Sequence, residues 1–131
     1  MPVERSANGS GAPGNIRRAA ALGPWAVSGP AIAVGTTALA DTAWADAMRV
    51  RLRCEAAQLD ATLAGANLDV IGGTSLFRLV DTLAADELFQ HLGRAGIMVR
   101  RFDERPRWLR FGLPKDAGEW ERLRAALAGW A

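Results

Sequence analysis

A chain of 131 residues, half of them hydrophobic and 23% charged, has the composition of one globular domain with a modest core. The net charge is only +2, and the fifteen arginines and one lysine are interspersed with 14 acids, which argues against a nucleic-acid-binding protein. The lack of a long uncharged apolar run argues against a membrane span, and a single cysteine excludes both an internal disulfide and a four-cysteine zinc site.

The first fifteen residues are rich in Gly, Ser, Pro and Asn and show no apolar periodicity. This composition predicts a disordered leader over residues 1–15 and a folded domain over residues 16–131. No apolar h-region follows the early charges, so no secretory signal is predicted and a reducing cytoplasm is the expected location. The domain is predicted to open with a short helical turn, Ile16–Leu22, that ends at Gly23-Pro24.

Helical periodicity dominates residues 31–64, which predict either two helices or one helix broken near Asp41-Thr42. Pro30 suits the first turn of this region, because its missing N–H would have no helical partner there. Gly65 is the predicted C-cap.

Short strands are predicted next, at Leu68–Ile71 and Leu76–Val80, with Gly72-Gly73 as the turn between them. In the second strand the alternation puts Phe77 and Leu79 on one side and Arg78 on the other. The sequence then predicts a helix capped by Thr82 and running to about Arg94, with Leu88 and Leu92 facing inward, and Gly96 ends that segment. Strands are predicted at 97–102 and 108–113. Asp116 and Glu119 start the last helix, whose apolar stripe is Trp120, Leu123, Leu127 and Trp130.

The predicted order is helix, helix, strand, strand, helix, strand, strand, helix. Short strands close in sequence favour a small antiparallel or mixed sheet. We therefore expect an α+β, two-layer domain with helices packed on one face of a short-stranded sheet.

Four segments, in the right order, resemble the C-terminal small domain of the threonine-phosphate decarboxylases. These enzymes act in cobalamin biosynthesis, are relatives of histidinol-phosphate aminotransferase, and belong to the fold-type-I pyridoxal-phosphate (PLP) enzymes. The segments are Leu22-Gly-Pro-Trp-Ala-Val-Ser-Gly-Pro-Ala31, Val70-Ile-Gly-Gly-Thr-Ser-Leu-Phe-Arg-Leu79, Gly96-Ile-Met-Val-Arg-Arg-Phe102 and Trp108-Leu-Arg-Phe-Gly-Leu-Pro114.

The resemblance implies that this domain closes over the active site and contributes an arginine from a strand. The matching pattern is Leu109-Arg110-Phe111, so Arg110 is the candidate for binding the carboxylate of a phosphorylated amino acid. A guanidinium can hold a carboxylate through two parallel hydrogen bonds, which fixes the substrate relative to the cofactor. Arg100 matches a position able to bind the substrate phosphate or carboxylate.

The same resemblance places the PLP-binding lysine in a large domain that this chain does not match. Lys115 is the only lysine, and it follows the arginine strand, so no catalytic role is assigned to it. Alone, the chain is therefore expected to be an inactive part of a PLP-dependent lyase or aminotransferase. Its expected partner is a separate large-domain chain or a second copy in a homodimer.

Interpretations without any ligand-binding or catalytic role stay open for these residues. Arg110 and Arg100 can also be ordinary surface residues of a half-exposed strand, Cys54 is predicted to be buried, and His91 is predicted to be a surface or interface residue. The alternative function is a non-catalytic module that binds an anion or another protein.

Overall fold

The computed structural model describes residues 27–130, and the chain divides into two compact units, Met1–Thr42 and Ala43–Ala131. The predicted disordered leader and the predicted turn over residues 16–22 lie outside the described residues.

Helix α2, Gly29–Ala40, is the described element of the first unit. The Ser28 hydroxyl accepts a hydrogen bond from the Ala31 N–H at 3.4 Å, and Pro30 lies in the first turn, as predicted. No residue of α2 is buried. The helical region breaks at Asp41, as predicted, and of the two alternatives the structure has two helices.

Helix α3, Thr42–Gly65, follows, and only its C-terminal half is buried, through Ala56, Leu59 and Leu63. The predicted C-cap at Gly65 is wrong, because the helix includes Gly65 and the chain reverses at Asn67, whose φ is +55°. Asparagine is one of the few residues with a side chain that adopts this left-handed conformation readily. Cys54 is exposed on α3, so the prediction that it is buried is also wrong.

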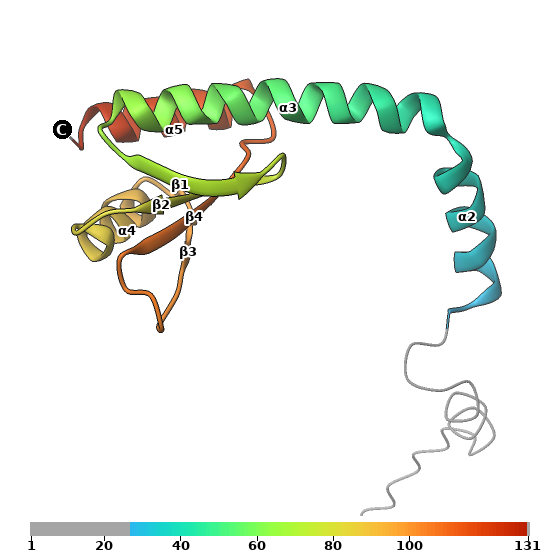
Figure 1. Ribbon diagram of the computed structural model, residues 1–131, viewed down its shortest axis with the longest axis horizontal. Helices are drawn as coiled ribbons and strands as arrows, with labels where there is room; N and C mark the ends of the chain where they lie inside the picture. The colour runs from blue at the N-terminus through green and yellow to red at the C-terminus, as the bar shows by residue number, and fades with distance from the viewer. Residues whose placement is uncertain (1–26, 131) are drawn as a thin grey trace, which may run out of the picture. The chain divides into compact units, whose positions relative to one another are not determined.

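Four strands form one antiparallel sheet in the described part of the chain, in the order β1-β2-β4-β3 (Figure 1). The strands are β1 Asp69–Thr74, β2 Phe77–Asp81, β3 Arg100–Arg101 and β4 Trp108–Gly112. The sequence left antiparallel and mixed sheets open, and the structure has the antiparallel one. Strand β3 is much shorter than predicted, and β4 is hydrogen-bonded on both sides.

The glycine pair assigned to a turn lies inside β1, and the turn is formed by Ser75 and Leu76. Gly73 has a φ of +156° and is paired with Arg78. A Cβ atom at this position would collide with the carbonyl oxygen of Phe77. Glycine is needed here for close approach of two strands and not for chain reversal.

Gly73→Ala is expected to lower the free energy of unfolding by about 1–3 kcal/mol, because the methyl group forces this part of the hairpin apart. Gly72→Ala is the matched control, since a Cβ atom there has no neighbour within 4 Å. Urea unfolding of both variants checks the prediction. Equal effects at the two positions would contradict it.

Helix α4, Ala85–Arg94, begins three residues after its predicted cap. The Thr82 hydroxyl instead accepts a hydrogen bond from the Ala84 N–H at 3.3 Å, which forms a turn before the helix. Leu88 and Leu92 point inward as predicted, and Gly96, with a φ of +72°, ends the segment.

Helix α5, Ala117–Ala128, starts as predicted, with the Asp116 carboxylate accepting a hydrogen bond from the Glu119 N–H at 2.9 Å. Its apolar stripe packs into the core through Trp120, Leu123 and Leu127.

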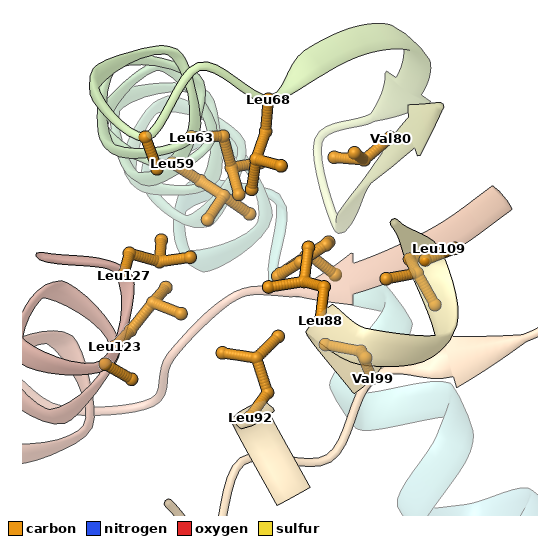
Figure 2. Close-up of a cluster of buried hydrophobic side chains, with 14 of the residues drawn as sticks. Leu59, Leu63, Leu68, Val80, Leu88, Leu92, Val99, Leu109, Leu123 and Leu127 are labelled. Atoms are coloured by element: carbon orange, nitrogen blue, oxygen red, sulfur yellow. The ribbon is translucent and has the colours of Figure 1, made fainter. Parts of the chain in front are cut away.

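All three helices of the second unit cover the same face of the sheet, which confirms the expected two-layer α+β arrangement. Val80 and Leu109 are directly opposite each other in β2 and β4 and are fully buried. Figure 2 shows the side chains that meet there from α3, α4, α5 and the sheet, among them Leu59, Leu63, Leu88, Leu92, Leu123 and Leu127. None of the helices within residues 27–130 combines the length and apolarity that a bilayer span needs.

One ion pair lies between the layers. Arg78, on the helix-covered face of β2, donates through Nε and Nη2 to the two carboxylate oxygens of Asp60 in α3, the second contact measuring 2.9 Å. The Arg78 side chain is only 16% exposed. The hydrogen bonds with Asp60 raise the pKa of Arg78, and its Nη1 also donates to the carbonyl of Thr74. This arginine therefore fastens α3 to the β1–β2 hairpin.

Candidate anion-binding site

Arg100 and Arg110 are directly opposite each other in the paired strands β3 and β4. Because Leu109 and Phe111 are buried under the helices, the alternation of β4 turns Arg110 to the other face of the sheet. Residues directly opposite in an antiparallel pair have Cβ atoms about 4.5–5.5 Å apart. The register thus brings both sequence-predicted site residues together on the face without helices.

Both arginines line an open groove of about 870 Å³ at the β3 edge of the sheet. Its wall is mostly apolar around them and includes Leu76, Phe77 and Met98. Met98 is 94% exposed and Leu76 is 58% exposed, so the rim presents apolar surface to solvent. A smaller cavity of about 190 Å³ adjoins it at Met98, Val99 and Gly112 and extends towards α5.

Arg100 and Arg110 differ from the neighbouring arginines in their ion pairing. Arg78, Arg101 and Arg107 are ion-paired with Asp60, Asp86 and Asp81, respectively.

Within residues 27–130, by contrast, neither Arg100 nor Arg110 has a carboxylate within 4.0 Å or donates a side-chain hydrogen bond. Like charges directly opposite in a sheet repel each other, and an anion held between them relieves that repulsion.

Lys115 does not fit the role of a PLP-binding lysine. Its side chain is 75% exposed and its Nζ lies 3.1 Å from a carboxylate oxygen of Glu119. The hydrogen bond with Glu119 and the nearby carboxylates raise the pKa of Lys115. A lysine that forms a Schiff base is typically desolvated, with a lowered pKa, so this environment is the opposite of the one required.

We therefore expect that PLP added to the isolated chain forms no stable Schiff base with Lys115. The absorbance spectra of wild type and Lys115→Ala should then be the same. The amine stays protonated and solvated, and any reaction with the aldehyde reverses when free cofactor is washed out. Absorbance spectra after desalting check this. A stable band lost in Lys115→Ala would show that the chain holds the cofactor by itself.

The other sequence candidates have structural roles. The Nε2 atom of His91 lies 2.8 Å from the carbonyl oxygen of Ala126, and its ring contacts that of Trp130, with centroids 5.5 Å apart. It therefore joins α4 to α5. No group of three or more metal-ligating side chains occurs in the part of the chain that the structure describes.

Sequence reasoning missed two aromatic rings at the site. The Arg110 guanidinium lies over the ring of Phe77, and that of Arg100 lies over the ring of Phe102. Phe77 was assigned to the correct side of its strand, but only the register of β2 against β4 brings it next to Arg110.

Comparison with known proteins gives two close relatives. The chain is 47% identical over 107 residues to a threonine-phosphate decarboxylase of Sinorhizobium sp, a match that covers 82% of this chain and 32% of the relative. It is 42% identical over 110 residues to a threonine-phosphate decarboxylase of Pseudomonas aeruginosa, covering 83% of this chain and 33% of the relative. No protein-family model matches. The chain is therefore related to the threonine-phosphate decarboxylase family, and it spans about one third of the length of the relatives that it matches.

Proposed function

We propose that this chain is the substrate-carboxylate-binding part of a PLP-dependent enzyme that acts on a phosphorylated amino acid, as a decarboxylase or an aminotransferase. Arg110 binds the substrate carboxylate, and Arg100 binds the phosphate or assists with the carboxylate. The observation that carries the proposal is the cross-strand pair of arginines, both lining one groove and neither ion-paired within residues 27–130.

Each arginine has a distinct task in this proposal. Arg110 is half-buried in the central strand β4, where flanking buried residues fix its position, so it suits a bidentate contact that orients the reacting end of the substrate. Arg100 is exposed on the edge strand β3 and suits the more solvated phosphate.

The cofactor and its lysine belong, in this proposal, to the remaining two thirds of the enzyme. PLP would supply the electron sink for the reaction. The length of the relatives and the unsuitable environment of Lys115 support this division. The apolar rim of Leu76 and Met98, next to the arginines, is where the cofactor-bearing part would close over the groove, because burial of such side chains drives association.

Arg110→Gln is expected to weaken binding of O-phospho-L-threonine to the isolated chain by about 10- to 100-fold, because a charge-assisted contact is worth roughly 1.5–3 kcal/mol. Calorimetric titration or amide chemical-shift titration measures the affinity. Arg94→Gln is the matched control, since Arg94 lies in the last turn of α4 and does not line the groove.

The affinity of the wild-type chain should also fall as salt screens the two guanidiniums. Equal affinities of wild type and Arg110→Gln would reject the proposed site. Specific binding of a peptide or protein in the groove, with no response to the phosphorylated amino acid, would favour the interaction module instead.

A further inference from the structure

Each arginine of the candidate site lies against an aromatic ring. The Cζ atom of Arg110 is 5.2 Å from the centroid of the Phe77 ring, and the Cζ atom of Arg100 is 5.4 Å from that of Phe102. Both distances are within the range of about 6 Å in which a cation is attracted to the face of a ring.

An aromatic ring stabilises a guanidinium without using its hydrogen-bond donors. The quadrupole of the ring attracts the cation, whereas the five N–H groups of a guanidinium form their hydrogen bonds with lone-pair acceptors. A carboxylate partner, in contrast, occupies the N–H edge, as Asp60 does for Arg78 and Asp81 does for Arg107. The two groove arginines thus lie against rings, and within residues 27–130 no carboxylate pairs with their N–H groups, which remain available to an incoming anion.

We infer that Phe77 is a positioning residue for Arg110, and that Phe102 does the same for Arg100; this inference rests on the proposed function. The quadrupole of each ring compensates part of the repulsion between two guanidiniums that the register sets opposite each other. Each ring also restricts the rotamers of a long side chain before the anion arrives. Less conformational entropy is then lost on binding.

The placement of Phe77 follows from the sheet. Arg78 and Val80 turn towards the helices, so the alternation turns Phe77 to the face that carries Arg110. Phe77 is directly opposite Gly112, two residues from Arg110, and therefore diagonal to it. The glycine leaves the guanidinium free to reach across to the ring. Phe77 and Arg110 both line the groove.

The test compares the affinity of the full chain for O-phospho-L-threonine in wild type, Phe77→Leu and Phe77→Tyr. Leucine keeps the apolar volume but lacks the ring, and we expect it to weaken binding about three- to tenfold. Tyrosine keeps the ring and should restore near-wild-type affinity. Phe102→Leu should produce a loss of similar size through Arg100.

Trp108→Leu is the matched control, because Arg105 lies over the Trp108 ring at 5.3 Å but does not line the groove. This substitution removes the same kind of contact and should leave the affinity unchanged. Thermal unfolding of each variant shows that it is folded. If Phe77→Leu does not fold, Phe77→Met replaces it with a more flexible side chain of similar volume.

The outcomes separate the inference from the proposed function. Wild-type affinity in Phe77→Leu, together with weakened binding in Arg110→Gln, overturns the positioning role and leaves the binding site intact. An equal loss in Phe77→Leu and Trp108→Leu also overturns it, since the effect is then general. Unweakened binding in Arg110→Gln, or no binding by the wild type, rejects the proposed function and the inference with it.

Discussion

Replacing Leu88 with alanine is expected to lower the free energy of unfolding by about 2–5 kcal/mol, a large part of the roughly 5–15 kcal/mol typical of a domain. Leu88 is fully buried and lies at the centre of the core, where α4 meets the sheet and the other helices (Figure 2). The substitution removes apolar contacts and leaves a cavity that the surrounding helices cannot close completely.

Leu83→Ala is the matched control, because Leu83 is 84% exposed and precedes the same helix. It should change the free energy of unfolding by no more than about 0.5 kcal/mol. Urea unfolding, followed by circular dichroism, measures both. A loss in Leu83→Ala as large as that in Leu88→Ala would contradict the prediction, because burial would then not account for the effect.

Breaking the ion pair between α3 and β2 is also expected to destabilise the domain substantially. In Asp60→Asn the mostly buried guanidinium of Arg78 loses its charged partner while remaining under the helix. We expect the free energy of unfolding to fall by about 2 kcal/mol, between the cost of breaking a fully buried pair, about 3–5 kcal/mol, and that of an exposed pair, about 0–1 kcal/mol.

Asp46→Asn is the control for this prediction. Asp46 pairs with Arg49 on the surface of α3, and both side chains are at least 65% exposed. Its loss should cost less than about 0.5 kcal/mol. Chemical denaturation at low and moderate salt measures both pairs. Equal costs, or a cost at Asp60 that salt abolishes, would show that the Arg78 pair is solvated and does not join the layers.

The helices and their inner faces could be predicted from the sequence because their apolar spacing is a local property. Leu88, Leu92, Leu123 and Leu127 were assigned correctly on spacing alone. The predictions that failed concern residues whose conformation depends on contacts between distant segments. The glycines at 72 and 73 are typical of a turn, and only the approach of Phe77 across the hairpin explains why they lie within a strand. Arg78, likewise, has a partner 18 residues away that no motif indicates.

At the candidate site, too, local features could be predicted from the sequence and contacts between strands could not. The alternation of Leu109, Arg110 and Phe111 could predict that the arginine points away from the core. It could not predict which residue faces Arg110, because the pairing of β3 with β4 depends on the turn between them and on burial along both strands. The pairing of the two arginines and the rings beneath them therefore needed the structure.

The order of strands in the sheet determines which of the two arginines, Arg100 or Arg110, can shift so that the distance between their guanidiniums changes. Strand β4 is hydrogen-bonded to a strand on each side. A shift of its pairing register by one residue would turn Arg110 into the apolar core and expose Leu109 and Phe111 to solvent. Strand β3 is a two-residue edge with a single neighbour. Adaptation to a longer or shorter ligand is thus expected through substitutions in β3 and its flanks, while the position of Arg110 stays fixed.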